Sequence, residues 1–81
     1  MINDHGLAVE VSRILLEVSG RIDETVALVH QQSSEPESQE YCRAAGAIMG
    51  SILTEILNPI FQSHPDIAPL ELQSFYIRPE K

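Results

Sequence analysis

The sequence predicts an all-α protein: a long helical hairpin with a short third helical turn and a C-terminal strap, dimerising into a four-helix bundle. Three observations predict this fold. Apolar residues recur every three or four positions in two long segments, a connection containing Ser and Pro separates these segments, and the chain has no Trp, two Phe and two Tyr. A core built from Ile, Leu, Val, Met and Ala is typical of packed helices. We expect one helical domain over residues 1–81.

The first helix is predicted at about residues 4–31. Its apolar positions, spaced three and four apart, are Leu7, Val11, Ile14, Leu15, Val18, Ile22, Val26 and Val29. This spacing places them on one face, which we expect to pack on the core. The opposite face carries Glu10, Arg13, Glu17, Arg21 and Glu24. These alternating charges can pair across a helical turn. Asn3 or Asp4 can cap the first turn, and Gly20 marks a possible bend.

The connection is expected within Gln31–Ser38, where the apolar period is lost. Ser34 and Glu37 have the spacing of a capping box, in which each side chain bonds the backbone amide of the other. Pro36 then falls in the first helical turn, where its missing N–H costs nothing. The second helix is therefore predicted at about residues 35–58.

The apolar face of the second helix covers nearly half of its circumference, which is more than one partner helix needs. Pairing two hairpins about a twofold axis would cover it, so we expect a homodimer. The residues predicted at this interface are Tyr41, Ala45, Gly46, Ile48, Met49, Gly50, Ile52, Leu53 and Ile56. Gly46 and Gly50 also form a stripe of small residues with Cys42 and Thr54, which predicts a close helix crossing, either within the chain or between two copies.

The pair Asn58–Pro59 predicts that the second helix stops or kinks, because proline disfavours helical geometry in the residue before it. A short helix is expected at about residues 59–64. Pro65 and Pro69 exclude a long helix after that point, so residues 65–81 are predicted to form an extended strap. The apolar content of residues 70–77 predicts that this strap is ordered against the helices.

The charge of the chain argues against nucleic acid and membrane partners. Twelve Asp and Glu against five Lys and Arg give a formal net charge of −7, the wrong sign for phosphates or an anionic membrane. The longest apolar run, Ala44–Leu53, is shorter than the roughly 20 residues that span a bilayer. An acidic surface can steer a basic protein partner or simply keep the chain soluble. The lone Cys42 forms no disulfide within the chain, so we expect a cytoplasmic protein.

Chemistry-bearing motifs are weak throughout the sequence. His5, His30 and His64 lack the spacing of paired metal ligands, so no metal or cofactor is expected. Glu37 and Glu40 fit the N-terminal end of a helix, and Cys42 fits a small core residue. No catalytic residue is assigned, and the chain is not expected to be an enzyme.

Two functions stay open at this point. The first is a non-catalytic protein-protein interaction or regulatory module acting as a homodimer. The alternative is a small enzyme or ligand-binding subunit with a site at the dimer seam around Tyr41, Arg43 and Glu55. The stretch Tyr41–Gly50, followed by Glu55–Pro59 and by His64 and Pro65, resembles a family of small helical proteins of bacteria. This resemblance implies a bacterial cytosolic source and no particular activity.

Overall fold

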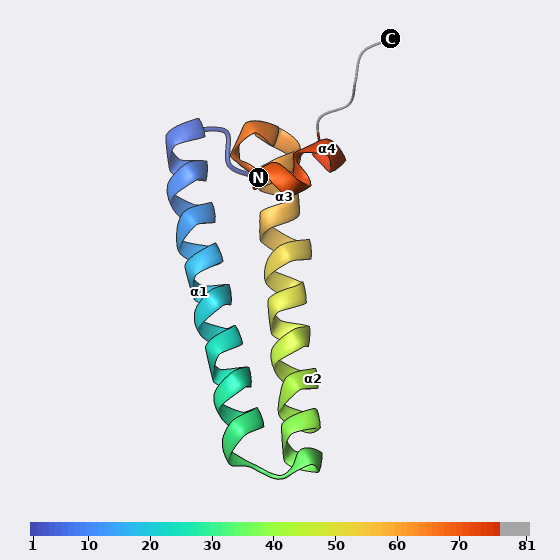
Figure 1. The fold of residues 1–81 in the computed structure, drawn as a ribbon. Helices are drawn as coiled ribbons and strands as arrows, with labels where there is room; N and C mark the ends of the chain where they lie inside the picture. Colours follow the sequence, from blue (N-terminus) through green and yellow to red (C-terminus); the bar gives the residue numbers. More distant parts are fainter. Residues whose placement is uncertain (77–81) are drawn as a thin grey trace.

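The computed structural model describes residues 1–76, which form two long antiparallel helices with short helical turns at one end (Figure 1). The elements are α1 (His5–Gln32), α2 (Glu35–Ser51), the π-helical η1 (Ile52–Leu57), α3 (Asn58–Ser63), the 3₁₀ turns η2 (Pro65–Ile67) and η3 (Leu70–Leu72), and α4 (Gln73–Tyr76). Residues 1–76 contain no strand, which confirms the all-α class.

Local hydrogen bonds explain where the two long helices begin. The Asp4 carboxylate accepts a bond from the amide of Leu7 at 2.7 Å and caps α1. Ser34 caps α2 and forms the expected capping box with Glu37, whose carboxylate accepts from the Ser34 amide at 3.2 Å. Both motifs satisfy amides that have no partner inside the helix. The capping box confirms the start predicted for the second helix.

The helix that begins at Glu35 does not stop at Asn58, the first of the two outcomes predicted there, but continues through Pro59 to Ser63. The six residues before α3 are π-helical, and the amide of Asn58 donates to the carbonyl of Leu53, five residues earlier. In an α-helix, the proline ring would clash with the carbonyl four residues before it. The wider π turn displaces that carbonyl and so accommodates the ring.

The hydrophobic core lies at the open end of the hairpin, away from the connection at Ser33 and Ser34. Its buried residues are Ala8, Leu57, Ile60, Phe61 and Ala68, with Ile2, Val11, Leu15, Ile52, Ile56, Ile67 and Tyr76 packed against them. Nearer the connection, Ala45 and Ser38 are the buried residues of α2. Most of the hairpin is therefore only two helices thick and has no third layer to cover its faces.

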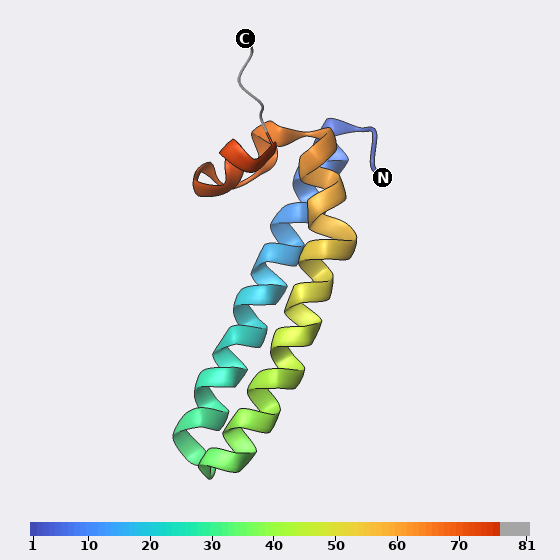
Figure 2. The same cartoon turned by 90° about the vertical axis from the view of Figure 1, so that its right-hand side faces the viewer.

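The segment from η2 to α4 projects to one side of the hairpin at its open end (Figure 2). It is more helical than the extended strap that the sequence predicted. The Tyr76 ring meets the edge of Phe61 with centroids 5.5 Å apart, and the Tyr76 hydroxyl donates to the side-chain oxygen of Asn58. Leu70 is 83% exposed, so the expectation that the strap buries it is wrong. Ile77, also expected to be ordered, lies outside the described residues.

Candidate interaction surface

A row of exposed apolar side chains follows one face of the hairpin. The hydroxyls of Thr25 and Tyr41 lie 2.6 Å apart and show which sides of α1 and α2 share this face. Seven and eleven residues correspond to about two and three helical turns, so they lead to positions on the same side of a helix. Counted back from Thr25 and forward from Tyr41, these positions hold aliphatic side chains. We call this set the seam: Ile14, Val18 and Thr25 of α1, Tyr41 and Ile48 of α2, and Ile52 of η1.

Four of the six seam residues are exposed, whereas Thr25 and Ile52 are half-buried. Ile48 is 57% exposed and Ile14 is 46% exposed, although both are large aliphatic residues on long helices. Two shallow grooves, each of about 390 Å³, lie beside Ile14 and Val18 and beside Ile48 and Ile52. These exposed aliphatic side chains and the two grooves make this face the candidate interaction surface of the molecule.

Charged side chains border the seam on α1. Arg13 pairs with Glu10 at 3.3 Å and with Glu17 at 3.1 Å, and Arg21 pairs with Glu24 at 3.0 Å. These pairs confirm the alternating ladder predicted from the sequence, and bonding to Glu10 raises the pKa of the Arg13 guanidinium. All of these side chains are more than half exposed, so the pairs stabilise the helix only weakly.

The bond between Thr25 and Tyr41 has a defined direction. The Thr25 hydroxyl donates to the carbonyl of Ile22 at 2.6 Å, and a threonine hydroxyl has one hydrogen. Its oxygen therefore accepts from Tyr41.

The structure separates the predicted interface residues into several environments. Tyr41, Ile48 and Ile52 lie on the seam. Ala45 is 3% exposed and packs inside the chain, while Met49 and Ile56 are half-buried. Gly46, Gly50 and Leu53 are exposed on α2 and η1, at helical positions that turn away from Ile48.

The small-residue stripe does not form a close crossing within the chain. A Cβ atom added at Gly46 or Gly50 would meet nothing within 4 Å. Cys42 is exposed, which corrects the prediction that it is a small core residue. The glycines of the stripe are therefore not explained by packing between the two helices of one chain.

Sequence reasoning missed the contribution of α1 to the seam. The predicted apolar face included Ile14 and Val18 but directed them toward the core. The structure buries Ala8 and Ser12 of α1 and packs Val11 and Leu15 against the core. Ile14 and Val18 are instead 46% and 40% exposed. The signal available in the sequence was an apolar face on α1 wider than one neighbouring helix can cover.

The alternative site around Tyr41, Arg43 and Glu55 is not assembled within one chain. Tyr41 and Glu55 are fourteen residues apart on one helix, which corresponds to about 20 Å along its axis. Glu55 lies beside Ile48 and Ile52 on the seam side, whereas Arg43 is exposed two positions from Tyr41 and turns to another face. One chain alone therefore brings no catalytic constellation together here.

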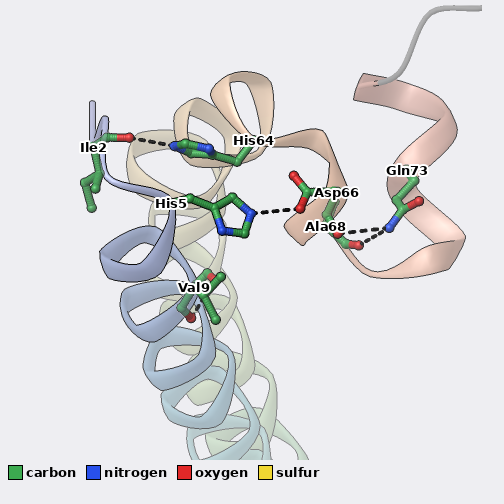
Figure 3. Close-up of polar contacts among 8 residues, drawn as sticks. Ile2, His5, Val9, His64, Asp66, Ala68 and Gln73 are labelled. Atoms are coloured by element: carbon green, nitrogen blue, oxygen red, sulfur yellow. Dashed lines mark hydrogen bonds and ion pairs between the residues drawn. The ribbon is translucent and has the colours of Figure 1, made fainter.

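A second group of polar contacts joins the N-terminal residues to the turn around η2 (Figure 3). The His5 imidazole donates to the Asp66 carboxylate at 2.8 Å, and His64 donates to the carbonyl of Ile2 at 2.8 Å. The two imidazole rings meet edge to face, with centroids 5.4 Å apart. Because carboxylate and carbonyl oxygens only accept, both bonding nitrogens carry hydrogen. These contacts hold the N-terminal residues and η2 against the open end of the hairpin.

The described residues contain no group of three or more His, Cys, Asp or Glu side chains arranged to hold a metal ion. At the open end, His5 and His64 each use Nε2 in a bond to a protein oxygen. These two histidines thus join distant parts of the chain through hydrogen bonds.

The helix from Glu35 to Ser63 has 29 residues and a stretch of mean hydropathy 1.4, so by length and composition alone it could cross a membrane. The sequence-based prediction differs, because it ends the helix near Asn58 and rests on the apolar run Ala44–Leu53 alone. The hairpin buries 22% of that stretch. The rest of the stretch requires another cover or remains in water, and the expectation of no membrane partner stays a prediction.

Comparison with protein family models, curated proteins and solved structures finds no match to this chain, and the resemblance noted in its sequence gains no support from them.

Proposed function

We propose that this protein is a non-catalytic protein-protein interaction or regulatory module that acts as a homodimer, in which two hairpins pack seam to seam as a four-helix bundle. The observation that carries the proposal is the exposure of large aliphatic side chains, above all Ile48 and Ile14, along one face of a two-helix layer. Two helices alone form too thin a layer to bury such a face.

The elongated shape of the chain supports a partner of its own size. The radius of gyration is 15.5 Å, whereas a compact domain of this length has about 12 Å. A second hairpin laid along the seam would cover one long face of this two-helix layer (Figure 1).

The energetics point the same way. The core at the open end of the hairpin is small, and a chain of this length is marginally stable when it folds alone. Completing the burial of one half-exposed aliphatic side chain contributes on the order of 1 kcal/mol. The aliphatic seam residues of two copies together can therefore stabilise a dimer by several kcal/mol.

The charge of the protein supports a basic protein as its partner. A formal net charge of −7 disfavours nucleic acid and anionic membranes and suits a basic protein partner in the cytoplasm. The faces that point away from the seam would remain available to such a partner in the dimer.

Sedimentation analysis of the wild-type chain and the variants Ile48→Asp and Leu70→Asp tests the proposal. The wild type should be a dimer at micromolar concentration, and Leu70→Asp should match it because Leu70 lies away from the seam. Ile48→Asp should be monomeric or should dimerise at least 100-fold more weakly, because it buries an unpaired charge. Helix content by circular dichroism checks the folding of each variant. A wild type that stays monomeric at about 50 to 100 μM, the upper part of the micromolar range, would refute the homodimer.

If Ile48→Asp proves unfolded, the wild type still provides a test. The melting temperature of a dimer rises with protein concentration, because folding and association are linked. A melting temperature that does not change over a roughly 100-fold range of concentration would contradict the proposal.

A further inference from the structure

We propose that the two copies pack antiparallel, with the twofold axis crossing α2 at Ile48 and α1 near Ser19, so that Arg21 of each copy pairs with Glu17 of the other. This inference rests on the proposed homodimer and specifies the geometry of the same surface. It follows from the positions of the exposed seam residues and of the charges beside them.

The hydrogen bonds between α1 and α2 fix which residues lie at the same level. Thr25 bonds Tyr41, and His30 bonds Ser38 at 3.2 Å. Because the helices are antiparallel, the level of Ile48 on α2 corresponds to about Ser19 on α1. Ile48 is the most exposed seam residue and lies near the middle of the hairpin. A twofold axis at this level buries the largest part of the seam in both copies.

The charged residues of α1 are self-complementary about this level. Glu17 and Arg21 lie two residues before and two residues after Ser19, and both line the same groove on the seam side. An antiparallel copy of α1 therefore places Glu17 opposite Arg21, twice by symmetry. The Glu17 and Arg21 side chains are 66% and 79% exposed, so each can reach across the interface.

The residues of α2 and η1 follow the same symmetry about Ile48. Tyr41 and Glu55 each lie seven residues from Ile48, on opposite sides of it and on the same helical face. An antiparallel crossing brings Glu55 of one copy to Tyr41 of the other. The Tyr41 hydroxyl, which donates to Thr25 within the chain, can then donate to a carboxylate, a stronger acceptor. Two residues that one chain holds about 20 Å apart would meet only in the dimer.

The parallel arrangements lack this charge complementarity. If α2 and η1 lay parallel to their own copies, Glu55 would face Glu55, and like charges at such positions are destabilising. If instead α1 lay over α2 and η1 of the second copy with open ends together, Glu17 and Arg21 would lie at about the levels of Gly50 and Gly46 and would meet no opposite charge. The antiparallel arrangement avoids both costs.

Cysteine cross-linking of the full chain, with Cys42→Ser as the background, tests the position of the axis. The variants carry one new cysteine, at Ile48, Ile52 or Leu53, and are oxidised mildly at micromolar concentration. A residue on the axis lies next to its own copy, within the reach of a disulfide. Ile48→Cys should cross-link at least tenfold faster than the other two. Equal cross-linking at Ile48 and Ile52 would indicate parallel helices and overturn the inference.

A charge exchange provides a test that does not depend on disulfide geometry. Glu17→Arg and Arg21→Glu should each weaken self-association about tenfold, because each homodimer would oppose two like charges. An equimolar mixture should recover wild-type affinity, because both contacts in the mixed dimer become opposite in charge. In a parallel dimer, mixing would restore nothing.

Asp23→Arg and Arg43→Glu make the same charge changes away from the seam and serve as the matched control. Neither should weaken association, and mixing them should have no effect. If the wild type is a dimer but the Glu17 and Arg21 variants behave like this control pair, the antiparallel geometry is wrong and the homodimer stands. If the wild type is a monomer, the proposed function itself fails.

Discussion

The Nε2 atom of His5 lies 2.8 Å from the Oδ2 atom of Asp66, and this pair joins the first turn of α1 to η2 across 61 residues of sequence (Figure 3). The hydrogen bond from His5 holds the pKa of Asp66 below its ordinary value of 3.8. A group whose pKa is lowered by folding contributes stability above its unfolded value and loses it as pH falls through the folded value.

The substitution Asp66→Asn should therefore change how stability depends on acid. The wild type should lose this contribution as pH falls below about 4, whereas the variant lacks it at every pH. Thermal unfolding, followed by circular dichroism, measures the difference between about pH 2.5 and 6. This range extends about one unit or more on either side of the ordinary Asp pKa. Asp23→Asn is the matched control on α1. Profiles for Asp66→Asn and Asp23→Asn that coincide would show that the pair contributes nothing to stability.

Truncation of the open-end core should be far more costly than truncation of an exposed residue of the strap. Phe61→Ala should destabilise the protein by about 3 to 5 kcal/mol, because Phe61 is buried and contacts Tyr76. Leu70→Ala should cost less than about 0.5 kcal/mol. Urea unfolding measures both values. If Phe61→Ala does not fold, Tyr76→Phe, which removes only the bond to Asn58, should give a smaller loss that can be measured.

Alanine at the two glycines of α2 should raise stability rather than lower it. Because a Cβ at Gly46 or Gly50 meets open space, each change should stabilise the helix by about 0.5 to 1 kcal/mol through reduced freedom of the unfolded chain. The reverse change, Ala47→Gly, should destabilise by a similar amount. Thermal unfolding at fixed protein concentration tests all three. A lower melting temperature for Gly50→Ala would instead indicate that this glycine lies against a second copy.

The sequence was sufficient for the features set by local chemistry. The Asp4 cap, the capping box at Ser34 and the charge ladder around Arg13 each depend on residues within four positions of one another, and each forms as expected. The helix through Pro59 was not predicted, because a proline ordinarily ends or kinks a helix and the local rule does not anticipate a π turn before it.

The seam was only partly predictable from the sequence. Apolar spacing identified Ile48 and Ile52 correctly as members of a wide face, but spacing alone does not say which edge of a wide face turns inward. On α1, Val11 and Leu15 of the predicted face pack against the core, whereas Ile14 of the same face stays exposed. The pair formed by His5 and Asp66 joins distant parts of the sequence, and no local pattern marks it.

The apolar helix Glu35–Ser63 should not bind lipid, although its length and composition would allow it to cross a membrane. In the proposed dimer, Ile48 and Ile52 are covered by the second copy, and a net charge of −7 repels an anionic surface. Flotation with phosphatidylcholine vesicles, with and without phosphatidylglycerol, should leave the wild type at the bottom of the gradient. Ile48→Ala, which shortens the central seam residue without adding charge, should behave in the same way if it still dimerises. Wild-type protein that floats with neutral vesicles would show that lipid, and not a second copy, covers the apolar face. Flotation only with vesicles that contain phosphatidylglycerol would show that the net negative charge does not keep the protein from an anionic surface.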